Sequence, residues 1–329
     1  MVRRVGVRRG GQAVGALDGR VAIITGAASG IGREYARLFS REGASVVAVD
    51  LHAPEALVAE LVDAGGRALA VGGDVSSWDD AHRFVSATVD AFGDLHVVVN
   101  NAGGGPLALM SNMTEQQWDD QIRVNLKGNF CCTRAAVDYW LGRRDASHEV
   151  KASVINTTSG AGLFGNPESS AYGAAKAGAA AFTVIAALEL RGSGIRVNAV
   201  APAARTPTSG EGTDDVVARF MRAPDDPSEF DQWHPGNISP IVGYLATADC
   251  PITGEVFHAR GGVVGHFEGW TIGGTLEIGR RWTIAEIAEQ LPAVLAAAPS
   301  RDNAGGAAYA SLRNALRTDR LGPDEAGPA

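Results

Sequence analysis

The chain has little cysteine, little lysine and no long apolar run. Its 329 residues include only three cysteines, Cys131, Cys132 and Cys250, which suit neither a disulfide framework nor a CxxC metal site. No apolar signal core follows the arginines of the first twenty residues, and the uncharged helical stretch 177–188 is too short to span a bilayer. We therefore expect a soluble protein of the reducing cytoplasm, with no metal and no membrane segment.

Basic charge is also scarce. The formal net charge is −8, with 29 Lys and Arg against 37 Asp and Glu. Such a balance offers no general basic field for a phosphate backbone, which argues against nucleic acid as a partner. Glycine is frequent, with 42 residues, yet there is no collagen period and no proline-rich tract. The composition predicts a globular chain with one large domain or about two ordinary ones.

Short apolar runs alternate with segments of helical period. The runs are typical of buried parallel strands, and the segments between them of crossover helices. The runs cover 21–25, 45–50, 68–71, 95–100, 153–157, 195–200 and 256–259, and the segments cover 31–42, 54–64, 78–92, 115–140 and 170–191. Thr114 and Gln117 have capping-box spacing before the fourth segment. The pattern predicts an α/β fold, a three-layer, doubly wound parallel sheet of Rossmann type with about seven strands.

Other segments flank or interrupt this domain, which we place at residues 18–262. Residues 1–17 are interpreted as a flexible basic arm, and 206–235 as a lid, with a disordered insertion as the alternative. A short helix is compatible with 216–221. We expect residues 263–299, with helical spacing over 283–295, to pack on the core or on a partner subunit, and 300–329 to form a frayed tail.

The first strand-to-helix turn, VAIITGAASGIG, has the composition of a dinucleotide site. Glycines there permit a tight turn and let a pyrophosphate approach backbone N–H groups at the positive end of a helix, although any tight turn can use glycine. The candidate contacts are Gly26, Ser29, Gly30 and Ile31. Asp50 ends the second strand, where a carboxylate can accept both ribose hydroxyls of adenosine and would repel a 2′-phosphate. This favours NAD over NADP, with a turn-capping Asp as the alternative.

Two further strand ends carry small or amide residues on the same side. GDV follows the third strand and NNAG the fourth, and both are expected to line the cleft beneath the adenine and the nicotinamide. Such turns also occur for conformational reasons alone. The candidate contacts are Asp74, Val75, Asn101, Ala102 and Gly103.

A serine, a tyrosine and a lysine have the spacing of a proton-transfer site. Tyr172 and Lys176 are four residues apart, hence on one helix face, and Ser159 follows the preceding strand. A phenol is a poor base at neutral pH, and a neighbouring ammonium lowers its pKa by stabilising the phenolate. Lys176 is one of only three lysines, with Lys127 and Lys151. A solvated Tyr and Lys on an alanine-rich helix is the alternative.

Together these motifs resemble the classical short-chain dehydrogenase/reductase family over about residues 18–262. The resemblance rests on TGxxxGIG at 25–32, NNAG at 100–103, a Ser thirteen residues before YxxxK, and VNAVAP at 197–202. It implies that Tyr172 is the general acid/base, that Lys176 tunes the phenol and holds the nicotinamide ribose, and that Ser159 donates to the substrate oxygen. It also implies that Asn125, in VNLKG, anchors a proton-relay water.

The resemblance extends, with departures, to the segment after the sixth strand. It implies that Pro202 and the backbone near Arg205 hold the carboxamide of the cofactor. Ala203 stands where the family usually has Gly, and Thr206 lies one position earlier than the usual threonine. The sequence GGVVGHFEGW resembles the tail of bacterial hydroxysteroid and 3-hydroxyacyl-thioester dehydrogenases, and 163–164 form an apolar patch. We therefore expect a bulky apolar substrate.

The resemblance implies an NAD(H)-dependent oxidoreductase that interconverts a secondary alcohol and a ketone. It also implies a homodimer or homotetramer, paired through the fourth helix and the tyrosine-bearing helix. One alternative is an NAD-binding sensor or scaffold without turnover, against which all four catalytic positions hold the required residue types. Another is an epimerase or dehydratase of the extended branch, whose glycine motif has a shorter gap than this one.

Overall fold

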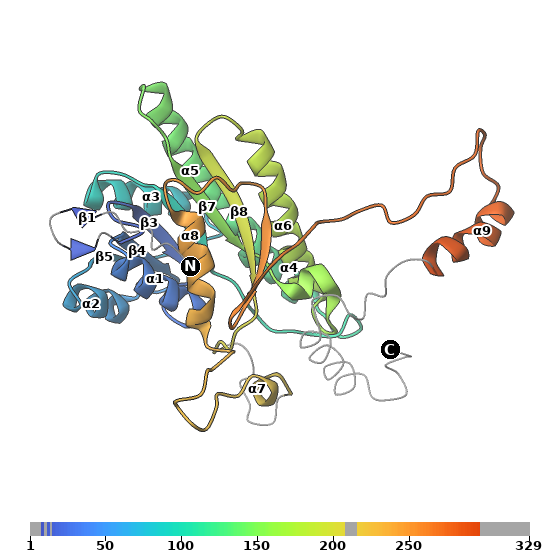
Figure 1. Cartoon of the computed structure of the whole chain (residues 1–329), viewed down its shortest axis with the longest axis horizontal. Coiled ribbons are helices and arrows are strands. Elements are labelled where there is room, and N and C mark those ends of the chain that lie inside the picture. Colours follow the sequence, from blue (N-terminus) through green and yellow to red (C-terminus); the bar gives the residue numbers. More distant parts are fainter. Residues whose placement is uncertain (1–7, 10–11, 14, 208–215, 297–329) are drawn as a thin grey trace. The chain divides into compact units, whose positions relative to one another are not determined.

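The computed structural model describes residues 8–9, 12–13, 15–207 and 216–296. The chain divides into two compact units, Met1–His266 and Phe267–Ala329. The expected tail 300–329, residues 208–215 of the expected lid, and much of the expected arm lie outside the described residues. Figure 1 labels the helices and several strands of the first unit, and helix α9 of the second.

The first unit contains an eight-stranded sheet, in the order β10-β9-β8-β7-β6-β3-β4-β5. The strands from β3 to β9 pair in parallel, and β10 pairs antiparallel with β9. Their bounds are β3 Val21–Thr25, β4 Ser45–Asp50, β5 Arg67–Gly72, β6 Val97–Asn100, β7 Ala152–Thr157, β8 Ile195–Pro202, β9 Val256–Arg260 and β10 Val263–His266. The predicted doubly wound sheet is confirmed. Because the strand order reverses between β3 and β6, a ligand cleft is expected beyond their carboxyl ends.

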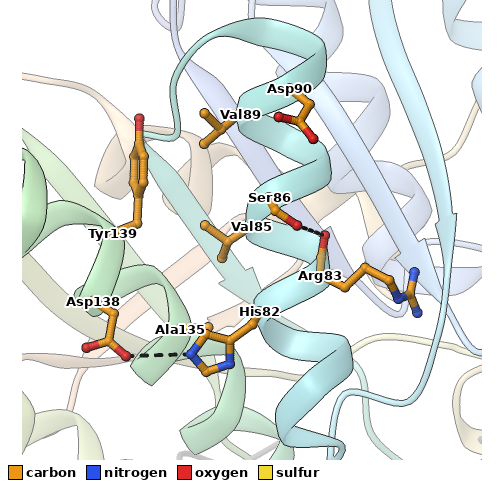
Figure 2. Close-up of a pocket in the computed structure, with 9 residues that line it drawn as sticks. All are labelled: His82, Arg83, Val85, Ser86, Val89, Asp90, Ala135, Asp138 and Tyr139. Carbon is orange, nitrogen blue, oxygen red and sulfur yellow. Dashed lines mark hydrogen bonds and ion pairs between the residues drawn. The ribbon is translucent and has the colours of Figure 1, made fainter.

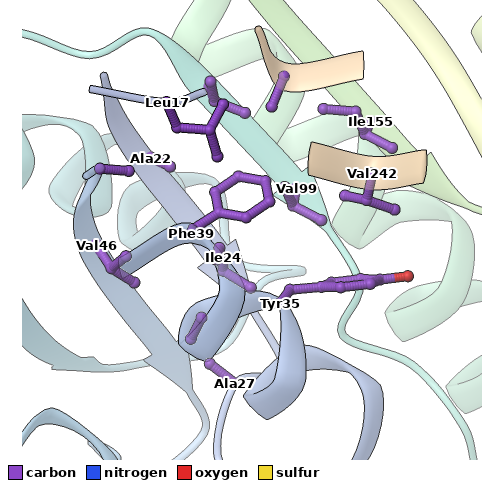
Figure 3. Packing of buried hydrophobic residues seen from close by; sticks show 14 of the residues in the cluster. Leu17, Ala22, Ile24, Ala27, Tyr35, Phe39, Val46, Val99, Ile155 and Val242 are labelled. Atoms are coloured by element: carbon purple, nitrogen blue, oxygen red, sulfur yellow. The ribbon is translucent and has the colours of Figure 1, made fainter. Parts of the chain in front are cut away.

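Helices cover both faces of this sheet. On one face, Tyr35 and Phe39 of α1 pack against Ile24 of β3 and Val242 of α8, all of them buried (Figure 3). On the other, buried side chains of α3, α5 and α6 form a second apolar cluster. The bounds are α1 Gly30–Arg41, α2 Glu55–Asp63, α3 Trp78–Phe92, α4 Glu115–Ile122, α5 Gly128–Asp145, α6 Ser170–Glu189, α7 Val216–Phe220 and α8 Ser239–Ala246. In the second unit, α9 spans Ile284–Ala296.

The structure departs from the predicted elements at a few places. The segment 115–140 is not one α-helix, because a π-helical turn, Arg123–Lys127, separates α4 from α5. The capping box of Thr114 and Gln117 at the start of α4 is confirmed. Helix α8, the edge strand β10 and a two-residue hairpin of β1 (Arg8–Arg9) with β2 (Gln12–Ala13) were not predicted.

Helix α6 is apolar and long enough to span a membrane by length and composition, and it is the one such helix among the described residues. Half of its most apolar window is buried inside the protein. Its buried residues include the cationic Lys176, and it packs against β7 and β8. These contacts are those of a core helix in a globular sheet domain.

At the amino-terminal ends of the strands, two arginines donate hydrogen bonds to the carbonyls at the end of α8. Arg20 Nε donates to Ala246 O at 3.2 Å, and Arg196 donates to Leu245 O at 2.9 Å and to Thr247 O at 2.8 Å. The last carbonyls of a helix lack intrahelical partners and carry partial negative charge, so cations suit this position. Burial, together with the charge of Arg196, lowers the pKa of Arg20 to about 10.

A neutral histidine lies at the same ends of the strands. The backbone N–H of Val21 donates to His96 Nδ1 at 3.1 Å, which requires that nitrogen to be unprotonated. Burial, and next the charge of Arg20, lower the pKa of His96. The folded state therefore resists protonation more than the unfolded chain, and the protein loses stability as the pH falls from about 6.5 through the folded pKa.

We predict that His96→Asn flattens this pH dependence, because the Asn Oδ1 can accept the same bond without titrating. Urea unfolding at pH 7.5 and 5.5 measures the change, with His52→Asn, at an exposed position, as the control. The loss of stability between the two pH values should shrink in the His96 variant alone. An equal loss in parent and variant would show that His96 does not carry the effect.

Candidate active site

The four predicted catalytic residues meet at the carboxyl ends of β6 and β7. Ser159 follows β7 and hydrogen-bonds with the phenol of Tyr172 on α6. One turn further along α6, Lys176 Nζ lies 5.8 Å from the centroid of the Tyr172 ring. A Cβ atom built on Gly103 would lie 2.5 Å from Asn125 Oδ1 and 3.0 Å from Lys176 Nζ. The amide and the amine thus converge over a glycine that follows β6.

Lys176 is bound to the end of β7 through both its side chain and its backbone carbonyl. Its Nζ donates to Thr157 O at 2.8 Å, and its backbone carbonyl accepts from Thr158 Oγ1 at 2.6 Å. The residue is only 1% exposed, and burial lowers the pKa of its amine to about 8. Its positive charge therefore falls as the pH rises through 8.

Burial dominates the ionisation of Tyr172. It raises the pKa of the phenol above its ordinary value, and the hydrogen bond with Ser159 opposes part of this rise. The sequence argument assigns the lowering of this pKa to Lys176. In the structure, a hydrogen bond with the Ser159 hydroxyl also acts in this direction, because hydrogen bonding to the phenolate favours the charged form, and the effect of Lys176 stays a prediction.

Asn125 is pinned by its side chain in the π-helical turn. Its Oδ1 accepts from Gly104 N at 2.9 Å, and its Nδ2 donates to Gly104 O at 3.1 Å and to Gln121 O at 3.1 Å. In an α-helix, the Gln121 carbonyl would accept from the backbone N–H of Asn125 itself. Gln121 Oε1 also accepts from Asn125 Nδ2, at 2.7 Å. Sequence reasoning missed this supporting role of Gln121, since no motif marks it.

The turn between β3 and α1 depends on glycine for its conformation and close packing. Gly26 and Gly30 have positive φ, 65° and 54°, and a Cβ on Gly32 would lie 2.1 Å from Gly26 O. Ser29 is the N-cap of α1, but within the described residues its side chain makes no capping hydrogen bond. The first N–H groups of α1, which include that of Ile31, therefore remain available to an anion, as a pyrophosphate site requires.

NNAG binds this turn to the neighbouring strand. Thr25 Oγ1 accepts from the backbone N–H groups of Asn101 and Ala102, both at 3.0 Å. Asn101 Nδ2 in turn donates to Thr25 O at 3.0 Å and to Gly26 O at 3.2 Å. The Asn101 side chain thus fixes the start of the glycine-rich turn through its backbone carbonyls.

Two carboxylates at strand ends are held in different ways. Asp50 accepts from Ala28 N at 2.9 Å and from Leu51 N at 2.8 Å, which fixes it beside the glycine-rich turn. Burial raises the pKa of Asp74, but hydrogen bonds from Ser76 and the charge of Arg123 outweigh it, so this pKa is lowered. The next residue of that loop, Val75, is buried.

Arg205 holds the described part of the expected lid. Pro202 ends β8, and the N–H of Arg205 donates to Trp233 O at 2.8 Å. The Arg205 guanidinium pairs with Asp231 at 2.6 Å and donates to Met221 O at 2.8 Å. The contact of this backbone with a carboxamide stays a prediction, and the role of Arg205 as an anchor was not visible in the sequence.

A groove of about 610 Å³ lies elsewhere, between α3 and α5 (Figure 2). None of the predicted site residues lines it. Polar side chains at its border are engaged with each other or with neighbours: His82 Nε2 lies 3.6 Å from Asp138 Oδ2, and the hydroxyl of Tyr139 donates to Asp94 Oδ1 at 2.8 Å. This groove is therefore separate from the candidate active site at the strand ends.

Comparisons with known proteins identify the class. The model of the short chain dehydrogenase family matches residues 20–215. The chain belongs to this family, and it is an oxidoreductase that uses a nicotinamide cofactor and acts on a small-molecule substrate.

Individual relatives cover most of the chain. Hydroxyacyl-CoA dehydrogenase ChsB1 of Mycobacterium tuberculosis is 38% identical over 256 residues, which are 74% of this chain and 78% of the relative. A 3-oxoacyl-[acyl-carrier-protein] reductase of Synechocystis sp. is 35% identical over 76% of this chain and 98% of its own length. The crystal structure of a short chain dehydrogenase from Mycobacterium avium superposes with a TM-score of 0.78, at 38% identity, over 87% of this chain and 98% of the other.

Proposed function

We propose that the protein is an NAD(H)-dependent dehydrogenase/reductase that interconverts a secondary alcohol and a ketone, with Tyr172 as the acid/base. The observation that carries the proposal is the hydrogen bond between Tyr172 and Ser159, with Lys176 Nζ 5.8 Å from the tyrosine ring. Ser159 follows β7, and the glycine-rich turn that we propose for the pyrophosphate follows β3 in the same parallel sheet.

In the oxidation direction, the Tyr172 phenolate takes the proton of the substrate hydroxyl. Ser159 donates to the same substrate oxygen and stabilises the charge that develops on it. Lys176 holds a ribose hydroxyl and supplies positive charge near the phenol, and Asn125 holds a water that returns the proton to solvent. A bound nicotinamide would supply the acceptor for the hydride of the carbinol carbon. In reduction, Tyr172 gives its proton back to the oxygen.

The substrate we favour is bulky and apolar, of 3-hydroxyacyl-thioester or steroid type. The segment after β6 pairs with the start of α6, because Ala108 forms an isolated bridge with Ser169, close to Tyr172. Two apolar side chains of that segment are largely exposed, Leu107 by 52% and Met110 by 70%. An apolar substrate would cover this surface. The relatives named hydroxyacyl-CoA dehydrogenase and 3-oxoacyl-[acyl-carrier-protein] reductase support the thioester class.

We predict that Tyr172→Phe lowers kcat by about a thousandfold, because it removes the hydroxyl that we propose exchanges the proton with the substrate. Cofactor binding, measured by NADH fluorescence, should stay within about twofold, since the ring and Lys176 remain. Tyr244→Phe on α8, at an exposed position, is the control. Near-parental turnover of a thioester or alcohol substrate by the Tyr172 variant would remove this residue from its role.

Asp50 is the basis for proposing NAD rather than NADP. Its carboxylate is fixed by two backbone N–H groups at the end of β4, where an adenosine ribose is expected to lie. Two of the three arginines of α1 are engaged by an acid: Arg33 pairs with Glu60 at 2.8 Å, and Arg37 with Glu60 at 2.6 Å. At Asp50, a 2′-phosphate would therefore meet a negative charge, with Arg33 and Arg37 already paired.

We predict that Asp50→Asn lowers the ratio of kcat/KM for NAD to that for NADP by about tenfold or more, because it removes a repulsive charge while keeping an acceptor. The measurement is steady-state kinetics with both cofactors. Asp63→Asn, at the end of α2, is the matched control. A parent enzyme that prefers NADP would overturn the choice of cofactor and leave the catalytic proposal intact.

We also propose a homo-oligomer in the cytoplasm. Three aromatic side chains form a strip across α3, α5 and α6: the rings of Trp78 and Phe130 lie 6.0 Å apart, and those of Phe130 and Phe182 lie 6.3 Å apart. Trp78 is 45% and Phe130 42% exposed, and further apolar side chains of α6 are exposed beside them. An apolar strip of this kind is typical of a subunit interface. The three cysteines are free thiols, which suits a reducing compartment.

We predict that Phe130→Glu shifts the protein to a smaller species in sedimentation velocity, because it buries a charge in the interface. Val62→Glu on α2 changes an equally exposed apolar residue outside the strip and serves as the control. A parent protein that sediments as a monomer at micromolar concentration would contradict the oligomer.

A further inference from the structure

A ladder of buried side chains runs beneath the active site from α5 to α6. Asn100 Nδ2, at the end of β6, donates to Thr133 Oγ1 on α5 at 2.9 Å and to Asn156 Oδ1 on β7 at 2.8 Å. Asn156 Nδ2 donates to Thr183 Oγ1 on α6 at 2.9 Å, and this hydroxyl donates to Ala179 O at 2.8 Å. Asn100 and Asn156 are direct register partners in the parallel sheet.

All four residues of this ladder are buried. The exposed fractions are 2% for Asn100, 3% for Thr133 and 0% for both Asn156 and Thr183. A buried polar network of this kind fixes its members strongly, because each broken bond leaves a desolvated donor or acceptor without a partner. The ladder therefore sets how α5, β6, β7 and α6 sit relative to one another.

One end of the ladder lies on the same helix stripe as two proposed catalytic residues. On α6, Tyr172, Lys176 and Thr183 are separated by four and seven residues, which places them on one face. At the other end, Thr133 lies on α5, which follows the π-helical turn that carries Asn125. Movement of α6 along its axis would carry Tyr172 and Lys176 with it.

The buried face of α6 is mostly smooth. Apart from Lys176 and Thr183, its buried residues are all alanine or glycine. Such a face allows close packing, and the partly buried Phe182 adds an apolar contact with the core. Polar links to β7 and the residues after it add directional constraints on the axial position: the Thr183 bond to Asn156 at one end, and the Lys176 bonds to Thr157 and Thr158 near the site.

We infer that Asn156 and Thr183 are positioning residues, which hold Tyr172 next to Ser159. The inference rests on the proposed function, because it concerns the same site. Without the hydrogen bond between Asn156 and Thr183, α6 is no longer fixed at the end distant from the site. The contact between Tyr172 and Ser159 then loosens, and the phenol loses the hydrogen bond that favours its ionised form. Neither residue touches the substrate or the cofactor in this arrangement.

The test compares three variants of buried threonines. Thr183→Val removes the hydroxyl and keeps the shape of the side chain, and Thr183→Ser keeps the hydroxyl. Thr88→Val on α3 is the matched control, because Thr88 is also fully buried and its hydroxyl donates to a carbonyl of its own helix, Phe84 O, at 2.7 Å. Within the described residues, no strand amide donates to the Thr88 hydroxyl.

We predict that Thr183→Val lowers kcat by about tenfold to a hundredfold, with the KM for the cofactor changed by less than about threefold. The pH profile of oxidation should move to higher pH, because the phenol becomes harder to ionise. Thr183→Ser should restore both quantities, and Thr88→Val should change neither.

Two results would overturn the inference: a Thr183→Val enzyme with parental kcat and pH profile but lower thermal stability, or equal kinetic losses in Thr88→Val. If Thr183→Val does not fold, Thr183→Cys, with a weaker hydrogen-bonding group of similar size, takes its place in the same comparison. An inactive parent would contradict the proposed function instead. The ladder is then decided by ultraviolet titration of Tyr172, isolated as the difference from Tyr172→Phe, in parent and Thr183 variants.

Discussion

The burial of one ammonium group organises the active site. Lys176 is almost wholly removed from water, and a buried charge must find acceptors nearby. It finds the carbonyl of Thr157, the last residue of β7, so the parallel sheet supplies a fixed acceptor at its carboxyl end. Because Tyr172 lies one turn earlier on the same helix, the position of the amine also sets that of the phenol.

Glycines make this arrangement possible at the ends of two strands, β6 and β3. Gly103 leaves the space over the end of β6 to Asn125 Oδ1 and Lys176 Nζ, and a methyl group there would displace both. Gly32 does the same for the turn after β3, where a Cβ would run into the carbonyl of Gly26. Each strand end thus brings backbone close to functional side chains, and the groups that meet there come from segments far apart in the sequence.

The sequence predicted the parts of the site that depend on local spacing. Tyr172 and Lys176 lie on one face because they are four residues apart, and the strands are recognisable because parallel strands are apolar on both faces. The π-helical turn at Asn125 escaped prediction, since it arises when a side-chain amide occupies the Gln121 carbonyl. The link from Asn156 to Thr183 was also missed, because hydrogen bonds between distant segments leave no local pattern.

Stability and chemistry occupy opposite edges of the sheet. At the amino-terminal edge, Arg20 and Arg196 satisfy the last carbonyls of α8, and His96 accepts from the first strand of the domain. These bonds satisfy backbone groups at that end of the strands. At the carboxyl ends, helix α1 begins without a side-chain cap through Ser29. The N–H groups of its first turn lack intrahelical partners, which is a cost to the isolated fold, and an anionic cofactor would remove that cost on binding. This difference between the two ends favours ligand binding at the carboxyl ends of the strands.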